Sequence, residues 1–288
     1  MTPRVTITGG SGRIGSWVVK NLQDDYDIVI FDQQLPKESL RARVLLGDHT
    51  QPTAIAEACQ GSVAIIHLSA IPSPARHPES EVFRTNVLGT YAVHTAAAIT
   101  GIPCVISTSS QSAFGWAWGK RDFLPRYLPL DEDHPDEPDD GYGLSKVVGE
   151  AIAWSFHRKT GMRTIVLRPP AVTGPTGYQS ILQSETATNW RATLFSYIDV
   201  RDLAQAFRCA LEHPEVVCDR FNVAADDALC SSPINELLPQ LDHRFQEMAQ
   251  QLAPNQPMVS NARAKRLLRW TPTISWRTEV EQERATDH

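Results

Sequence analysis

A tyrosine and a lysine lie four residues apart in the segment GYGLSK, residues 141–146. On a helix this spacing puts both side chains on one face, so the ammonium group of Lys146 can lie beside the phenol of Tyr142. A phenol titrates near pH ~10, and a neighbouring positive charge favours its ionised form. The pair could therefore take a proton from a substrate hydroxyl near neutral pH. Because the YxxxK spacing is common, an ordinary exposed helix face is the alternative.

A glycine-rich turn near the amino terminus separates a β-rich segment from a helix-like one. The segment RVTIT, residues 4–8, is followed by GGSGRIG, residues 9–15, and by SWVVKNLQ. Such a turn lets the backbone approach a pyrophosphate, whose charge is met by amide N–H groups and by the positive end of the helix dipole. The sequence therefore predicts a dinucleotide site at Gly9, Gly12, Arg13, Ile14 and Gly15.

Asp32 ends the second β-rich segment, residues 27–31, and lies seventeen residues after Gly15. A carboxylate at this position accepts hydrogen bonds from the adenosine ribose and repels a 2′-phosphate, which favours NAD over NADP. Arg13, inside the glycine turn, is the one residue that argues for NADP. The alternative for Arg13 is a solvated turn residue.

Strand-like and helix-like segments alternate along the first two thirds of the chain. Strands are expected near residues 4–8, 27–32, 43–47, 63–68, 102–108 and 163–168, and helices near 13–23, 52–59, 79–100 and 142–160. Asp199 should open a further helix. The alternation predicts an α/β fold, a Rossmann-type doubly wound parallel sheet with ligands at the carboxyl ends of its strands. After about Asp226 prolines punctuate short segments, which indicates a small carboxyl-terminal substrate-binding lobe.

The ordered series of motifs resembles the extended short-chain dehydrogenases/reductases, in particular the NAD-dependent epimerase/dehydratase family. Beyond the glycine turn and YGLSK, the series contains GD at 47–48, HLSA at 67–70, NVLGT at 86–90, STSSQSAFG at 107–115, LRP at 167–169, YIDVRD at 197–202 and RLLRWTP at 266–272. The resemblance implies NAD as the cofactor. It also implies a Rossmann domain made of residues 1–170 and 196–225 and a substrate lobe made of residues 171–195 and 226–288.

The resemblance extends the cofactor site beyond the glycine turn. It implies that Gly47 and Asp48 lie at the adenine, that Leu68, Ser69 and Ala70 line the groove, and that Asn86 helps to hold the cofactor. A cap on the next helix is the alternative for Asp48, and a helix-surface amide is the alternative for Asn86.

The resemblance also assigns catalytic roles. Tyr142 would remove the proton from a substrate hydroxyl, Lys146 would hold the nicotinamide ribose and lower the pKa of the tyrosine, and Ser110 would hydrogen-bond the reacting oxygen. Ser110 takes this role because it lies five residues before Gly115, the family's register for this hydroxyl. Ser109 is the competing assignment, and hydroxyls that cap local backbone groups are the alternative for both.

Two differences from larger family members point to a small substrate. Gln111 and Ser112 stand where nucleotide-sugar dehydratases carry an Asp-Glu pair, so a dehydratase is not expected. Only thirty residues, 169–198, separate Arg168 from Asp199, which leaves little chain for a nucleotide-binding lobe.

The compact layout is similar to that of the uronate dehydrogenases, although the insert 116–140 is a departure from them. Gln111 is expected at the substrate, and Arg191 is placed where a guanidinium would anchor a substrate carboxylate. A surface arginine paired with Glu185 is the alternative for Arg191. Trp116 and Trp118 could stack on a sugar face or pack within the protein as a lid or dimer contact.

These features predict an NAD-dependent oxidoreductase that transfers hydride from a hydroxyl of a small sugar or sugar acid. A UDP-sugar 4-epimerase would use the same Ser110, Tyr142 and Lys146. A protein of another class, a non-catalytic NAD-sensing regulator, is disfavoured because such proteins often lack the Tyr-Lys pair.

Composition narrows the partners. The chain has 288 residues, 42% of them hydrophobic, and a net charge of −6. There is no basic stripe for nucleic acid, no apolar run of about 18 residues for a membrane, no secretory signal and no histidine cluster spaced for a metal. Five scattered cysteines indicate reduced thiols in the cytoplasm.

The resemblance implies a homodimer through the helices that begin near Glu79 and Tyr142. The acidic stretch 131–140 is expected to be a solvated loop.

Overall fold

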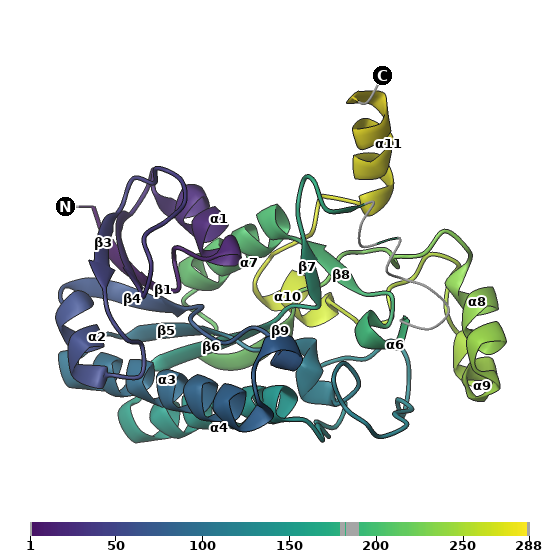
Figure 1. Cartoon of the computed structure of the whole chain (residues 1–288), viewed down its shortest axis with the longest axis horizontal. Coiled ribbons are helices and arrows are strands. Elements are labelled where there is room, and N and C mark those ends of the chain that lie inside the picture. Colours follow the sequence, from purple (N-terminus) through teal and green to yellow (C-terminus); the bar gives the residue numbers. More distant parts are fainter. Residues whose placement is uncertain (1, 179–181, 183–189, 287–288) are drawn as a thin grey trace.

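A seven-stranded parallel sheet forms the centre of the molecule (Figure 1). The computed structural model describes residues 2–178, 182 and 190–286. The strands lie in the order β3-β2-β1-β4-β5-β6-β9, the arrangement of a Rossmann-type fold. Their bounds are β1 Arg4–Thr8, β2 Asp27–Asp32, β3 Arg43–Leu46, β4 Ser62–His67, β5 Cys104–Thr108, β6 Arg163–Arg168 and β9 Cys218–Asn222.

The first six strands and the doubly wound fold confirm the sequence prediction. Three short strands were not predicted. β9, with the sequence CDRFN, pairs with β6 at the edge of the sheet, and β7 (Ala171–Thr173) pairs with β8 (Tyr197–Asp199) outside it. These segments are only three or five residues long, and the first half of β9 is polar, so they lack the apolar run of a buried parallel strand.

Helices cover both faces of the sheet. In Figure 1, α1 and α7 lie on one face, and α2, α3 and α4 lie on the other. Among the described residues, no helix has the length and apolar character needed to cross a bilayer. The bounds of these helices are α1 Arg13–Leu22, α2 Pro52–Ala58, α3 Glu79–Thr100, α4 Gly141–Thr160 and α7 Val200–Glu212.

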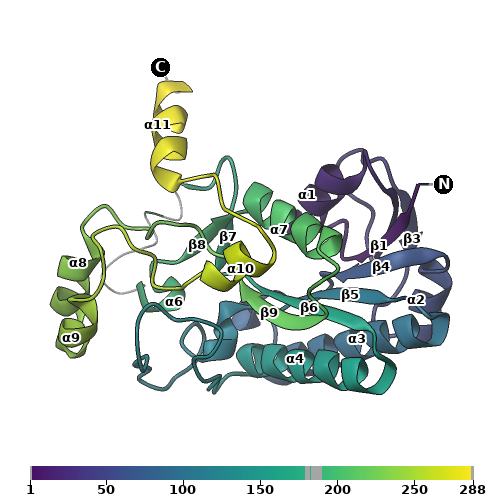
Figure 2. The ribbon, with the colours of Figure 1, turned by 180° about the vertical axis from the view of Figure 1, so that it is seen from behind.

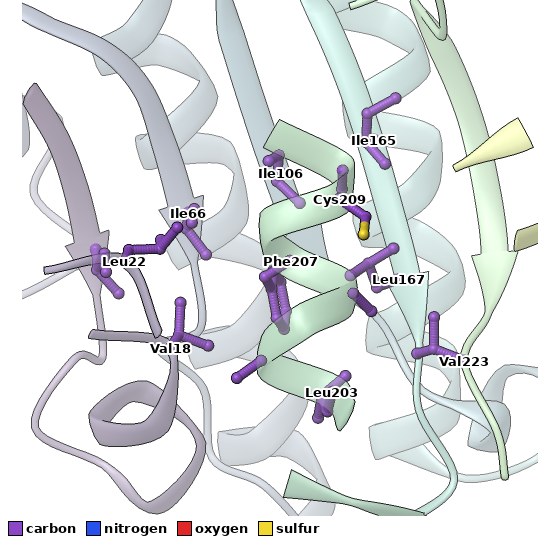
Figure 3. Packing of buried hydrophobic residues seen from close by; sticks show 14 of the residues in the cluster. Val18, Leu22, Ile66, Ile106, Ile165, Leu167, Leu203, Phe207, Cys209 and Val223 are labelled. Carbon is purple, nitrogen blue, oxygen red and sulfur yellow. The ribbon is translucent and has the colours of Figure 1, made fainter. Parts of the chain in front are cut away.

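The core between the sheet and α1 and α7 is built from branched and aromatic side chains. Figure 3 shows Leu203, Phe207 and Cys209 of α7 packed near Ile106, Ile165 and Leu167 of the central strands. Asp199 accepts a hydrogen bond from the backbone N–H of Arg201 and so caps α7, as expected from its position before the helix. The capped helix packs against the central strands, and the predicted cofactor site lies at the carboxyl ends of these strands.

A second apolar cluster lies outside the sheet and is called the lobe core here. It joins the insert after Gly115 to residues 190–195 and 224–259. Its insert members include Trp116, Phe123 and Leu130, and its other members include Trp190 and Phe245. The helices of this region are α6 Trp190–Thr193, α8 Ile234–Leu241 and α9 Gln246–Ala249, while α10 (Ala262–Leu267) and α11 (Trp276–Thr286) follow. Seen from behind, α8, α9 and α11 lie at the opposite end of the molecule from β3 (Figure 2).

The acidic stretch 131–140 is not the solvated loop that the sequence suggested. Glu132, His134 and Asp140 are buried. The Glu132 carboxylate accepts a hydrogen bond from the backbone N–H of Asn222 at 2.7 Å, and Asp136 forms ion pairs with Arg168 and with Arg220. Buried cations and backbone donors on β6 and β9 thus hold the stretch against the sheet, and a charge pattern alone does not reveal such partners.

Candidate active site

Tyr142 and Lys146 lie in the first turns of α4. Asp140 caps this helix, because its Oδ1 accepts hydrogen bonds from the N–H groups of Tyr142 at 2.9 Å and Gly143 at 2.8 Å. Lys146 Nζ lies 5.3 Å from the centroid of the Tyr142 ring and donates to the Thr108 carbonyl at 3.1 Å. The helix therefore brings the two side chains together on one face, next to the carboxyl end of β5.

The titration of this pair differs from the sequence expectation. Burial raises the pKa of Tyr142 to about 12, although a hydrogen bond with Ser110 opposes the shift. Burial also lowers the pKa of Lys146 to about 8, and the Glu150 carboxylate opposes that shift. In the protein without cofactor, desolvation outweighs the lowering of the tyrosine pKa that the sequence suggested.

Ser109 and Ser110 point to different partners. Ser109 is buried, and its Oγ donates to Glu150 Oε1 at 2.6 Å. Ser110 Oγ instead donates to Ser112 Oγ and accepts from the Ser112 N–H, each at 3.1 Å, and it lies close enough to the Tyr142 phenol to oppose the rise in its pKa. The geometry thus favours Ser110 over Ser109 as the hydroxyl that shares a reacting oxygen with the phenol.

Two clefts meet at the carboxyl ends of the strands. The Tyr142 cleft has a volume of about 620 Å³ and extends from the glycine turn to the insert. The Asp32 cleft has a volume of about 480 Å³ and extends from the glycine turn to α3. Gly9, Gly12, Leu68 and Ala70 line both clefts, so the two are continuous. A continuous groove across the strand ends is the place where a Rossmann fold binds a dinucleotide.

The glycine turn fits the pyrophosphate of such a ligand. A Cβ atom on Gly9 would lie 2.7 Å from the Ser69 nitrogen, and Gly9 has a φ of +75°. A Cβ atom on Gly15 would collide with the Gly9 carbonyl. The amino terminus of α1 has no side-chain cap and no acidic residue in its first turn, so its N–H groups and dipole are available to an anion.

The Asp32 cleft fits the adenosine ribose of NAD. The Asp32 carboxylate accepts backbone hydrogen bonds from Ser11 at 3.0 Å and Gln33 at 2.7 Å, which hold it at the end of β2. No lysine or arginine lines the Asp32 cleft in the part of the chain that is described. Arg13 lines the Tyr142 cleft instead, so its guanidinium is not placed to bind a 2′-phosphate beside Asp32. The residues present therefore fit NAD.

Most of the predicted cofactor residues line one of the two clefts, and two of them do not. Arg13, Ile14 and Gly15 line the Tyr142 cleft, and Gly47 and Ser69 line the Asp32 cleft. Two residues do not line either cleft as the structure describes it. Asp48 Oδ1 accepts from the Thr50 N–H at 2.9 Å in the turn before α2, and Asn86 exchanges hydrogen bonds with both backbone groups of Ile71. Asn86 thus positions the loop that follows β4.

Of the predicted substrate residues, Gln111 lines the Tyr142 cleft and Arg191 does not. The Gln111 side chain is 3% exposed and lines the Tyr142 cleft, and no described residue accepts a hydrogen bond from its Nε2. Arg191 is absent from the described lining of that cleft, because it forms an ion pair with Asp242 at 2.5 Å and donates to the Phe123 carbonyl. Glu185, the partner considered from the sequence, lies outside the described residues.

Several lining residues were missed by the sequence interpretation. Ser11, Gln33, Gln34 and His49 line the Asp32 cleft, and Ala117, Pro169, Pro170, Ala171, Val172, Ala192 and Thr193 line the Tyr142 cleft. Pro169 and Pro170 directly follow β6, so the rule that ligands bind at strand ends could have indicated them. The described residues contain no group of three or more side chains able to hold a metal ion.

A small cavity lies beside Lys146. It has a volume of about 20 Å³ and is lined by Lys146, Asn86, Ser107 and Glu150 among others. This volume is enough for one water molecule, and the Ser107 hydroxyl has no described hydrogen-bond partner.

The fold and the helix-borne Tyr-Lys pair define the class of the extended short-chain dehydrogenases/reductases. The sequence profile of the NAD dependent epimerase/dehydratase family matches residues 5–224, and the chain belongs to this family. The family and the fitted groove make NAD the cofactor.

Relatives include two sugar dehydrogenases. The chain is 27% identical over 224 residues to the NAD-dependent glucose-6-phosphate dehydrogenase of Haloferax volcanii, covering 74% of this chain and 81% of that protein. It is also 27% identical over 232 residues to the uronate dehydrogenase of Agrobacterium fabrum, covering 78% of each chain. A solved short-chain dehydrogenase/reductase superfamily protein from Agrobacterium tumefaciens, with bound NAD, superposes with a TM-score of 0.74 at 22% identity, covering 97% of this chain and 95% of that chain. This structural match supports the fold.

Replacing Asp32 with alanine should relax the choice between NAD and NADP. The variant loses a charge-assisted acceptor for the ribose and the repulsion of a 2′-phosphate, so the ratio of the two dissociation constants should move about 10- to 100-fold toward NADP. Titration of both cofactors measures this ratio. Asp48→Ala is the matched control, because Asp48 turns to Thr50. An Asp32→Ala ratio equal to that of the control would contradict the ribose role.

Proposed function

We propose that this protein is an NAD-dependent oxidoreductase that transfers hydride from a hydroxyl-bearing carbon of a small sugar or sugar acid. The observation that carries the proposal is the cluster of Ser110, Tyr142 and Lys146 at the Tyr142 cleft, next to a groove that fits NAD. The names of the two dehydrogenase relatives support a sugar as the substrate class.

Each residue of the cluster has a distinct role in the proposed reaction. Ser110 and Tyr142 hold the substrate hydroxyl, and Tyr142 accepts its proton as the C–H bond of the same carbon breaks. When bound, NAD supplies the hydride acceptor and the positive charge of its oxidised ring. Lys146 lies beneath the phenol and would hold the nicotinamide ribose of the bound cofactor.

The proposal is tested by NADH formation. The purified, cofactor-stripped protein is mixed with NAD and a panel of free aldoses, uronic acids and UDP-sugars. Accumulation of NADH with a free sugar or uronic acid is the expected result. A panel without net NADH would contradict the proposed dehydrogenase.

A UDP-sugar 4-epimerase is the second candidate, because it would use the same three residues and belongs to the same family. It would retain NAD through turnover and form no net NADH. Interconversion of UDP-glucose and UDP-galactose in the same panel would favour the epimerase. A non-catalytic NAD-sensing regulator, the third candidate, would neither form NADH nor interconvert the UDP-sugars.

The rate of oxidation should rise with pH from about pH 6 to pH 8. The pKa of Tyr142 is about 12, so most of the phenol is protonated over this interval. The small ionised fraction, which acts as the base, increases as the pH rises. The reverse reduction needs the protonated phenol and should not show this rise. Turnover numbers measured in both directions across the interval check the signs. An oxidation rate that falls with pH would contradict Tyr142 as the base.

We propose a homodimer through the outer faces of α3 and α4, which pack side by side on one face of the sheet (Figure 1). Leu88 and Tyr91 on α3 and Leu144 on α4 are exposed apolar side chains on these faces. Leu88→Asp should weaken the dimer about 100-fold, because a two-fold interface repeats the charge. Sedimentation measures the association, and Leu35→Asp, at an exposed site away from both helices, is the control. A monomeric wild-type protein would exclude this interface.

The five cysteines support a reducing compartment, and we place the protein in the cytoplasm on this basis. All five lie within the described residues, all are free thiols, and four are buried.

A further inference from the structure

The substrate end of the Tyr142 cleft has an apolar wall. The side chains that form it come from the loop after β4, the insert, the segment after β6, and α6. They include Pro72, Trp118, Pro170, Val172 and Ala192. Trp118 is 43% exposed, whereas its neighbour Trp116 is stacked on Phe114 with ring centroids 5.3 Å apart. The indole of Trp118 is therefore the ring that remains available to the face of a ligand.

Positive charge is missing from this end of the cleft. Among the described residues, Arg13 and Lys146 are the only lysine or arginine side chains in its lining. Arg13 belongs to the glycine turn, and its guanidinium extends toward Gly174, where it would face the pyrophosphate of bound NAD. Lys146 donates to the Thr108 carbonyl from beneath the Tyr142 ring. Residues 179–189 contain no lysine, arginine or histidine in the sequence.

The arginines of the neighbouring lobe are neutralised by carboxylates. Arg191 is held by Asp242 at 2.5 Å. Three others have partners of their own: Arg244 with Asp122, Arg263 with Asp133, and Arg277 with Asp227. Moving Arg191 into the cleft would leave the Asp242 carboxylate without one of its cations. With NAD bound and Arg13 at its pyrophosphate, a ligand carboxylate or phosphate would meet no free counter-ion among the described residues of the apolar wall. Its desolvation would then be uncompensated.

One polar donor does face the substrate. The Nε2 group of Gln111 is buried at the cleft and lacks a described acceptor, although a buried amide donor without a partner is unfavourable. An oxygen on the substrate, next to the reacting carbon, would satisfy it. The Gln111 amide is neutral. It therefore favours substrates that accept a hydrogen bond over those that do not, without attracting an anion.

From these observations we infer that the site selects an uncharged substrate that presents an apolar face to Trp118 and an oxygen acceptor to Gln111. The inference rests on the proposed oxidoreductase function and narrows it: sugar acids, sugar phosphates and nucleotide sugars are disfavoured. The Trp118 ring binds the apolar face, and the Ser110–Tyr142 pair binds the reacting hydroxyl.

Matched pairs of neutral and acidic compounds test the charge preference. The pairs are D-glucose with D-glucuronate, and 1-phenylethanol with mandelate. Dissociation constants are measured by calorimetry on the full-length protein saturated with NADH, which prevents oxidation, and kcat/KM is measured separately with NAD. The neutral member should be favoured about 100-fold in a pair that binds. Equal or tighter binding of the acid would overturn the inference, and so would failure of both neutral compounds to bind.

Three variants and one control make the test specific. Ala192→Arg introduces a guanidinium at the exposed rim of the wall and should reduce the preference for the neutral compound about tenfold or more. Trp118→Ala should weaken both members of a pair, whereas Leu124→Ala, at another exposed apolar residue of the insert, should change neither. Gln111→Leu should raise KM more than it lowers kcat. An Ala192→Arg variant with an unchanged preference would also overturn the inference.

The two proposals fail in different ways. If 1-phenylethanol is oxidised and both glucose and glucuronate are inert, the sugar substrate is wrong while the charge selection stands. If glucuronate is oxidised faster than glucose, the sugar oxidoreductase stands and the charge selection is wrong.

Discussion

Replacing Tyr142 with phenylalanine is expected to reduce turnover about 1,000-fold while NAD still binds. The phenol is the group that would accept the substrate proton, and its neighbours Ser110 and Lys146 cannot replace it. Ser110 is a neutral hydroxyl, and Lys146 lies beneath the ring and donates to the Thr108 carbonyl. The ring itself is preserved in phenylalanine, so the packing of α4 should be retained. Steady-state kinetics and an NAD titration together measure the two effects.

Tyr26→Phe is the matched control for this experiment. The Tyr26 hydroxyl hydrogen-bonds Glu212 at 3.3 Å and does not line the Tyr142 cleft as described, so its removal should leave turnover near the wild-type value. A Tyr142→Phe enzyme with activity close to that of the control would show that another group is the base. Loss of NAD binding in Tyr142→Phe would instead show a structural effect of the substitution.

Replacing Glu150 with alanine is expected to lower the free energy of unfolding by about 3–5 kcal/mol. Glu150 accepts from Arg168 through both oxygens, at 2.6 and 2.7 Å, and from Ser109 at 2.6 Å. The Arg168 side chain is fully buried, and its carboxylate partners raise its pKa despite desolvation. Among the described residues, removal of Glu150 leaves Asp136 as the one carboxylate paired with the Arg168 guanidinium, which stays charged. Urea denaturation measures the loss.

Glu57→Ala is the control for this prediction, because Glu57 is exposed on α2 and its removal should change stability by less than about 0.5 kcal/mol. Similar unfolding curves for the two variants would show that the buried ion pairs do not stabilise the fold. Since Glu150 opposes the lowering of the Lys146 pKa, Glu150→Ala should also lower that pKa further.

Much of the fold could be predicted because the relevant signals are local. The run RVTIT before GGSGRIG defines β1 and the turn, and the bounds of α3, residues 79–100, agree with its sequence pattern. The proximity of Tyr142 and Lys146 could also be predicted, since a spacing of four on a helix determines which side chains share a face. Asp32 was visible because it ends a strand at the distance from the glycine turn that an NAD site requires.

The remaining features depend on contacts between distant segments. Glu132 is held by the Asn222 N–H, ninety residues along the chain, and by Arg220 of β9, which donates to its backbone carbonyl. Arg191 pairs with Asp242 rather than facing a substrate, and that partner is also distant in sequence. Periodicity reports which face of an element is apolar, but it carries no information about which charges meet after folding.

Contacts of the lobe core link the unfolding of different parts of the protein. Side chains of the insert pack with those of residues 190–195 and 224–259, while the acidic stretch that follows the insert is bonded to β6 and β9. Neither region can lose its structure without removing buried contacts from the other. The sheet and the lobe core should therefore unfold together as one cooperative unit, although each has its own apolar cluster.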